Sequence, residues 1–190
     1  AKHTLNCLHA RSIATLGRYG EINTNDFHKD LEYSLECRDD EMLNEFYIRA
    51  FPLAERIEFC EDMDRQTSGV DKIIHFPGGR MVTVDEKKRR KDYGDILLEL
   101  LKNKEKKRPG WLFYSECDYI VYAVMDAKKV YLLPVLLLQM AWKNNRKTWE
   151  EKYEKKDALN IGYTTQNIPI PTSVLLNAIR SEMDNCIDTA

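Results

Sequence analysis

The chain has 190 residues, enough for one domain with a substantial hydrophobic core. Its 43% hydrophobic and 10% aromatic residues exclude a compositionally disordered chain. The 29 basic and 31 acidic residues give a net charge of −2, which excludes an overall positive field. Any polyanion would therefore have to be bound by a local cluster of basic residues.

Cysteine usage and hydropathy indicate the compartment. The five cysteines are scattered, and no two of them form a Cys-x-x-Cys pair. This pattern argues against a disulfide framework or a zinc site and favours a reducing environment. The apolar run over residues 135–142 is too short to span a bilayer. The sequence therefore predicts a soluble cytoplasmic protein with no membrane partner.

Hydrophobic periodicity predicts the elements. Residues 1–38 give weak signals and are interpreted as an N-terminal extension. A helix is expected from Asp39 or Asp40 to about Phe51, because apolar residues recur there at helical spacing. Pro52 ends this helix or begins a continuation towards Ile57. Two apolar-rich runs around a Gly-Gly pair then predict a β-hairpin over residues 70–88.

The rest of the chain predicts further strands and helices. In order, these are a helix over 92–102, strands over 111–114, 118–125 and 130–133, a helix from Pro134 through 142, a solvated helix or loop over 143–156, an edge strand over 161–171 and a closing helix from Thr172 or Ser173. The order predicts an α/β fold with a central mixed sheet flanked by helices. We expect one domain, with its core at about 40–142 and a C-terminal strand and helix at 160–184.

The predicted hairpin carries the candidate chemistry. With Gly78 and Gly79 as a two-residue loop, counting outwards places Asp71 opposite Glu86. Paired residues in an antiparallel ladder share a face, with Cβ atoms roughly 5 Å apart. The period of two puts Lys88 on the same face, which also carries the apolar residues Ile73, Val82 and Val84.

Two interpretations of this face are open. Two carboxylates at this separation repel each other unless a cation lies between them, which suggests a divalent-metal site with an ammonium group beside it. The other interpretation is a salt-bridged strand end, in which Lys88 neutralises Glu86. The pattern of residues alone does not choose between them.

The sequence of the hairpin resembles that of a known family. Val70-Asp71, a fourteen-residue gap, and Glu86-Lys87-Lys88 after Val82-Thr83-Val84 resemble the PD-(D/E)XK nuclease superfamily. The stretches Gly-Val-Asp, Val-Asp-Glu-Lys, Tyr-Gly-Asp-Ile-Leu-Leu-Glu and Cys-Asp-Tyr-Ile-Val-Tyr are similar to uncharacterised phage and prophage members. The resemblance implies a restriction-endonuclease-like core over about residues 40–142, and only the hairpin carries its motif.

This resemblance implies roles for particular residues. Asp71 and Glu86 would bind Mg²⁺ or Mn²⁺, with the Lys87 carbonyl as a further ligand, since hard oxygen ligands suit these ions. Lys88 would polarise the attacking water and stabilise negative charge that develops on the phosphate. Arg90 would either hold a neighbouring phosphate or be a solvated arginine at the strand end.

The implied function is a metal-dependent nuclease of phage or prophage type that hydrolyses phosphodiester bonds in DNA. It would act in the cytoplasm of a bacterium or an infected host cell, and many nucleases of this fold act as homodimers. The alternative is a catalytically inactive nuclease-fold protein that binds nucleic acid or a protein partner, which the absence of an overall basic charge favours. A regulatory or assembly protein with a merely salt-bridged hairpin is the third interpretation.

Overall fold

The computed structural model describes residues 41–62, 65, 66 and 68–188. The extension expected over residues 1–38 lies outside the described residues. Helix α2 (Glu41–Ala50) confirms the first predicted helix, and Leu43 and Tyr47, one turn apart, supply its buried face. A continuation of this helix is wrong, because Arg56–Phe59 form strand β1.

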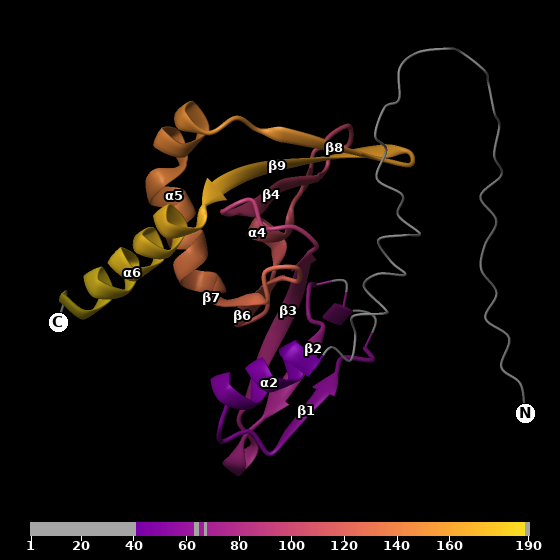
Figure 1. Ribbon diagram of the computed structural model, residues 1–190, viewed down its shortest axis with the longest axis vertical. Helices are drawn as coiled ribbons and strands as arrows, with labels where there is room; N and C mark the ends of the chain where they lie inside the picture. The colour runs from indigo at the N-terminus through magenta and orange to yellow at the C-terminus, as the bar shows by residue number, and fades with distance from the viewer. Residues whose placement is uncertain (1–40, 63–64, 67, 189–190) are drawn as a thin grey trace, which may run out of the picture.

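Five strands form the first sheet, in the order β1-β2-β3-β6-β7 (Figure 1). Strand β3 pairs antiparallel with β2 and parallel with β6, so this sheet is mixed, as predicted. Strands β6 and β7 confirm two predicted strands and pair antiparallel. The bounds are β2 (Lys72–His75), β3 (Met81–Arg89), β6 (Tyr119–Val124) and β7 (Lys129–Pro134).

Four strands form a second, antiparallel sheet in the order β5-β4-β9-β8, which the prediction of one central sheet did not include. Strand β4 replaces the helix predicted over 92–102. Alternate residues Ile96, Leu98 and Leu100 are buried, which is the period of a strand. The helix was wrong because a short run of leucines fits either period. The bounds are β4 (Asp95–Asn103), β5 (Arg108–Pro109), β8 (Lys156–Asn160) and β9 (Tyr163–Pro171).

Strand β9 confirms the last predicted extended segment. Residues 166 and 167 of β9 pair with both β4 and β8, and residues 163–165 pair with β8. The sheet order places β9 between β4 and β8, so the prediction of an edge strand is wrong for the strand as a whole. Residues 168–171, which hold both prolines, pair with β4 alone among the described strands, so a proline is tolerated there.

Three helices come after strand β3 in the chain: one lies in the connection from β3 to β6, and two come after β7. The segment Trp111–Tyr114 forms helix α4, so the strand predicted there is wrong. Four apolar residues are too few for periodicity to distinguish a strand from a helical turn. Helix α5 (Val135–Lys152) starts after Pro134 and continues through the charged segment, with Trp149 buried. Helix α6 (Thr172–Asp188) confirms the closing helix.

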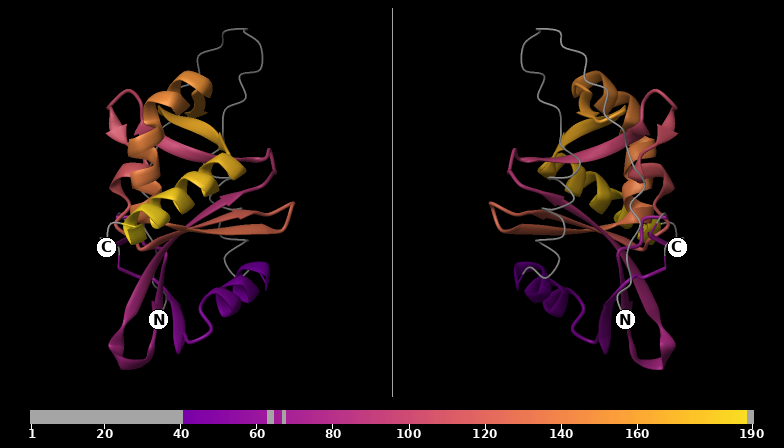
Figure 2. Two further views of the ribbon diagram at one scale, coloured as in Figure 1. Left: turned by 90° about the vertical axis from the view of Figure 1, so that its left-hand side faces the viewer. Right: turned by 90° about the vertical axis from the view of Figure 1, so that its right-hand side faces the viewer.

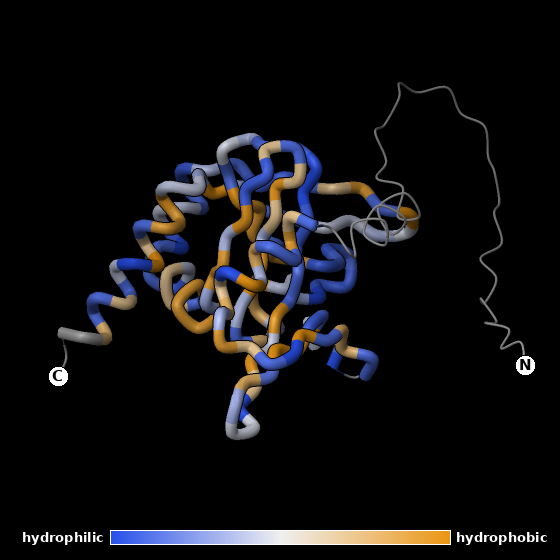
Figure 3. Tube along the Cα trace, turned by 60° about the horizontal axis from the view of Figure 1, so that its bottom comes forward, coloured by the Kyte–Doolittle hydropathy of each residue, from blue (hydrophilic) through white to orange (hydrophobic). Residues whose placement is uncertain are grey.

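The first sheet is buried on both faces. One face packs against α2 through a cluster that includes Leu43, Ile74 and Val84. The other face belongs to the larger cluster, which it shares with the second sheet and with α4, α5 and α6 (Figure 2). Orange and blue stretches alternate along the chain through this centre (Figure 3). The side chain of each β3 residue is therefore assigned to one of two packed layers by the strand register.

Among the described residues, no helix has both the length and the apolar character that a bilayer crossing needs.

Candidate metal centre

The turn between β2 and β3 contains three residues instead of two. Residues Pro77–Gly79 form a short 3₁₀ turn, and the Phe76 N–H donates to the Arg80 carbonyl at 2.9 Å. Gly78 and Gly79 both have positive φ, a conformation that glycine adopts without a Cβ penalty. Lys72 consequently pairs with Val84, so the predicted register is wrong by one residue.

A shift of one residue moves a side chain to the opposite face of a sheet. The structure therefore separates the predicted pair. Glu86 and Lys88 lie on the α2 side, as does Val84. Ile73, which was expected on that face, packs in the larger cluster on the other side.

Glu86 is the centre of a buried ionic network under α2. Its Oε1 lies 2.9 Å from Lys72 Nζ and accepts a hydrogen bond of 2.7 Å from the Tyr47 hydroxyl, and its Oε2 lies 3.0 Å from Lys88 Nζ. The Lys72 and Glu86 side chains are 4% and 6% exposed. Burial would raise the pKa of Glu86, but Lys72 and Lys88 together hold it below its ordinary value. For Glu86 and Lys88 the structure thus has the salt-bridged arrangement.

Asp85 and Lys87 form a second ion pair on the opposite face of β3. Lys87 Nζ donates to Asp85 Oδ1 at 2.6 Å, and the Asp85 side chain is 1% exposed. The other oxygen, Asp85 Oδ2, is buried and has no hydrogen-bond partner among the described residues. An unpartnered buried carboxylate oxygen is costly, because nothing replaces the water that it lost on folding.

Asp71 brings a second carboxylate to this pair. It precedes β2, and its Oδ2 accepts the backbone N–H of Glu86 at 2.7 Å. Asp71 acts on Asp85 both through its charge and through a side-chain hydrogen bond, which two carboxyl groups form only when one of them carries a proton. Burial raises the pKa of Asp85 to about 7, and Asp71 raises it further while Lys87 opposes the shift. Burial lowers the pKa of Lys87, but Asp85 and Asp71 outweigh it, so the net shift is upward and the ammonium stays charged.

We call Asp71, Asp85 and Lys87 together the candidate centre. The second sheet and α4 add two groups to its border. Glu99 of β4 accepts the Trp111 N–H at 3.1 Å, and burial raises its pKa while that bond and Lys87 oppose the rise. Burial also raises the pKa of Tyr114, which feels the charges of Lys87, Glu99 and both aspartates. The hydroxyl of Tyr114 therefore keeps its proton at neutral pH and can donate a hydrogen bond.

Two glycines allow the chain to pack this closely. A Cβ on Gly69, whose φ is +83°, would lie 3.1 Å from Asp85 Oδ2, so the absent side chain leaves space beside the unpartnered oxygen. A Cβ on Gly110 would lie 2.2 Å from the Glu99 carbonyl oxygen, which no side chain could accommodate. Gly110 thus permits the contact between α4 and β4 that brings Tyr114 and Glu99 together.

The structure brings together only part of the predicted site. Asp71 and Lys87 belong to the centre, Lys87 through its side chain, whereas Glu86 and Lys88 belong to the network under α2. Arg90 is exposed, one residue after the end of β3, and its phosphate contact stays a prediction.

Asp85, Glu99 and Tyr114 were not among the site residues predicted from the sequence. The first could have been found, because Asp85-Glu86-Lys87 has the same acid-x-lysine spacing as Glu86-Lys87-Lys88. The length of the turn decides between the two spacings. No sequence signal marks Glu99 or Tyr114, because pairing and packing between distant segments place them.

Within residues 41–62, 65, 66 and 68–188, no three Asp, Glu, His or Cys side chains are grouped so that they could hold a metal ion. The candidate centre contributes only two such side chains, the carboxylates of Asp71 and Asp85. Comparison with protein-family models, with curated proteins and with solved structures finds no match to this chain.

Proposed function

We propose that the chain is a metal-dependent nuclease that hydrolyses phosphodiester bonds in DNA. Asp71 and Asp85 hold the metal in this proposal, and Lys87 is the cationic residue beside it. The observation that carries the proposal is the Asp85 carboxylate beside that of Asp71. Its Oδ2 is buried without a hydrogen-bond partner among the described residues, and its Oδ1 lies 2.6 Å from the Lys87 ammonium.

The donor set suits Mg²⁺ or Mn²⁺. With both aspartates ionised, the two carboxylates and the Lys87 ammonium sum to one net negative charge, which a bound divalent cation would change to one net positive charge. Mg²⁺ keeps several waters and is commonly held by one or two carboxylates together with substrate phosphates, so a third protein carboxylate is not required. The space that Gly69 leaves beside Asp85 Oδ2 is consistent with a ligand at that oxygen. When bound, such an ion would lower the pKa of a coordinated water and offset charge on the scissile phosphate.

The protein's own groups have separate tasks. The Glu86 N–H fixes the orientation of the Asp71 carboxylate. Lys87, held by Asp85, directs a positive charge at the position where negative charge develops on the phosphate. Tyr114 supplies a neutral donor at the border of the centre, and Lys102 Nζ lies 5.6 Å from the centre of its ring, where it can meet an adjacent phosphate.

The order of elements supports a restriction-endonuclease-like core as part of the same proposal. A helix, an antiparallel set of three strands and, after a crossover with a helix, a strand parallel to the third correspond to α2, β1-β2-β3, α4 and β6. Asp71 and Asp85 lie on the neighbouring segments at the middle of this sheet, and Asp85-Glu86-Lys87 takes the place of the acid-x-lysine motif.

One cleavage experiment tests the proposal and the choice of residues. Single-stranded, duplex and branched DNA, and RNA, are incubated with the protein in Mg²⁺, Mn²⁺ or EDTA. We expect cleavage of DNA in either metal, none in EDTA, and a loss of at least 100-fold in Asp85→Asn and Lys87→Met, a typical loss when one electrostatic catalytic group is removed. Lys88→Met is the matched control, because it removes the neighbouring ammonium from the other face.

Three results would contradict the proposal or its choice of residues. Cleavage that survives EDTA or Asp85→Asn would exclude the metal centre described here. A folded protein that neither cleaves any of these substrates nor binds Mn²⁺ in calorimetry would favour the non-catalytic binding protein. If Lys88→Met abolished cleavage and Lys87→Met did not, the register-based choice of lysine would be wrong.

A further inference from the structure

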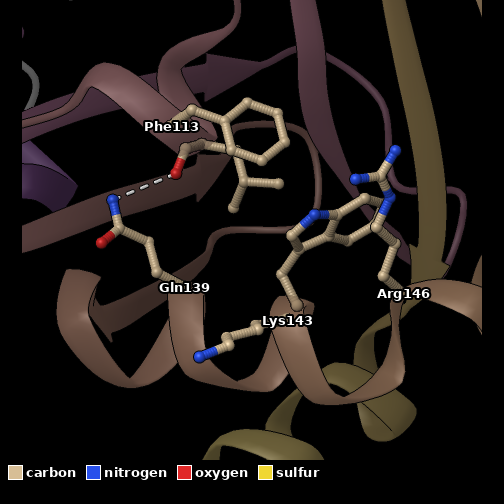
Figure 4. Close-up of a pocket in the computed structure, with 6 residues that line it drawn as sticks. Phe113, Gln139, Lys143 and Arg146 are labelled. Atoms are coloured by element: carbon tan, nitrogen blue, oxygen red, sulfur yellow. Dashed lines mark hydrogen bonds between the residues drawn. The ribbon is translucent and has the colours of Figure 1, made fainter.

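A pocket of about 480 Å³ lies between α4 and α5, outside the aspartate pair. Its lining combines aromatic, amide and basic side chains: Leu112, Phe113, Gln139, Trp142, Lys143 and Arg146. The side chains of Gln139 and Arg146 lie on opposite sides of it, with Phe113 above and Lys143 below in the view of Figure 4. The volume falls within the range of small-molecule sites, which run from about 300 to 1,000 Å³.

The aromatic wall of the pocket is partly open to solvent. Phe113 is 46% exposed, although large apolar side chains are usually buried. Its ring packs edge-to-face on Trp142, which is 4% exposed, at a centroid distance of 6.2 Å. A ring held by a buried neighbour and open on its free side is a stacking surface for a flat ligand.

The polar wall suits a base and its phosphates. Gln139 Nε2 donates to the Leu112 carbonyl at 3.1 Å, which fixes the amide while its Oε1 and second N–H retain hydrogen-bonding capacity. Arg146 donates through Nε to Glu150, so its terminal nitrogens remain as further donors. Lys155 also pairs with Glu150, which places two cations around that carboxylate.

The surroundings favour an anionic ligand. Residues 143–156 contain six basic and three acidic residues, although the whole chain has a net charge of −2. A second hollow continues along α5, lined by Lys143, Arg146 and Lys147 together with Glu150 and Glu151. This segment is a local basic cluster of the kind that polyanion binding by a chain without overall positive charge requires.

Helix α4 connects the pocket to the metal centre. Phe113 lines the pocket, and the next residue, Tyr114, borders Asp85 and Lys87. We propose that the α4–α5 pocket binds one nucleobase of a single-stranded segment of the substrate, which stacks on Phe113 while Lys143 and Arg146 contact the flanking phosphates. A base inside a duplex has both faces covered by its neighbours, so only an unstacked base can use this ring.

This inference takes its substrate class from the proposed function, but it predicts binding and does not require cleavage. The test is fluorescence anisotropy with the full chain in EDTA, using a labelled oligothymidylate of 12 nucleotides. Two probes of equal length accompany it, a duplex and an oligomer of abasic nucleotides. We expect the oligothymidylate to bind more tightly than either probe.

Phe113→Ala and Phe113→Leu should weaken binding of the oligothymidylate by about 5- to 150-fold, the range for loss of one base–aromatic stack. Both should leave binding of the abasic oligomer unchanged, because its phosphates are intact. The leucine variant keeps the apolar packing on Trp142, so a loss common to both variants cannot come from unfolding. Leu136→Ala is the matched control, because it also removes an exposed apolar side chain, which lies on α5 and does not line the pocket.

Lys143→Gln should reduce the slope of log K against log salt by about 0.7, the value for one phosphate contact on a single strand. Lys128→Gln, which removes an exposed lysine from the turn between β6 and β7, controls for the loss of one charge. The inference is overturned if Phe113→Ala weakens both oligomers equally or neither, or if the duplex binds as tightly as the single strand. Binding that depends on Phe113, combined with cleavage that is absent or ignores Asp85→Asn, would refute the proposed function and leave this pocket assignment standing.

Discussion

Replacing Asp85 by asparagine should change how the stability of the metal-free protein depends on pH. The fold raises the pKa of Asp85 from 3.8 to about 7, first through burial and then through Asp71. This shift of about 3 pKa units corresponds to about 4 kcal/mol, at roughly 1.4 kcal/mol for each unit. Asp85 is 1% exposed, so solvent screening reduces this figure little.

The sign follows from comparing the folded and unfolded chains. The folded protein binds the Asp85 proton more tightly, so this contribution to stability is complete below about pH 4 and is lost as the pH rises through about 7. Between pH 4 and pH 8, wild-type protein should therefore lose about 4 kcal/mol relative to Asp85→Asn. The variant also removes the partner of Lys87, but the ammonium stays charged over this range, so that loss is a constant offset.

Urea unfolding in EDTA at several values between pH 4 and pH 8 measures the difference. Asp184→Asn, which removes an exposed carboxylate from α6, is the control for the loss of one charge. A second series in Mg²⁺ or Mn²⁺ should stabilise the wild-type protein at pH 8 and leave Asp85→Asn unaffected, because binding to the folded state alone stabilises it. Parallel pH profiles for wild type and variant in EDTA would refute the electrostatic argument. Equal stabilisation of both proteins by metal would exclude Asp85 as a ligand.

Two further predictions test the buried contacts that hold the site in place. Lys72→Met removes one partner of the buried Glu86 and should lower the free energy of unfolding by about 3 kcal/mol. Lys104→Met breaks the exposed pair with Asp157 and should lower it by less than about 1 kcal/mol. Equal losses for the two variants in urea unfolding would contradict the structural role of the buried pair. Gly110→Ala should prevent stable folding, because its Cβ would lie 2.2 Å from the Glu99 carbonyl oxygen. Gly94→Ala has open space around the new Cβ and a φ of +72°, so it should lower the free energy of unfolding by about 1–2 kcal/mol. Coinciding thermal melts of the two variants would disprove this contrast.

Local pattern was sufficient for several elements of this chain. The apolar stripe of α2, the strands β6 and β7 and the start of α6 were predicted correctly, because their periodicity is long or their flanking residues mark a boundary. Pattern failed at β4 and α4, where short apolar runs are compatible with either state. In β4 the hydrogen-bond partners on β5 and β9 decided the outcome, and these partners are distant in sequence.

The sequence by itself determined that a hairpin carries Asp71 and, on its second strand, acidic and basic residues at acid-x-lysine spacing. Only the tertiary structure decided which of these residues meet. The three-residue turn sets the register, and the register sends Glu86 and Lys88 under α2 and Asp85 and Lys87 to the opposite face. Because side chains alternate along a strand, one additional residue in a turn exchanges a site for a salt bridge. Glu99 and Tyr114 then join the centre through contacts between segments, which no local pattern encodes.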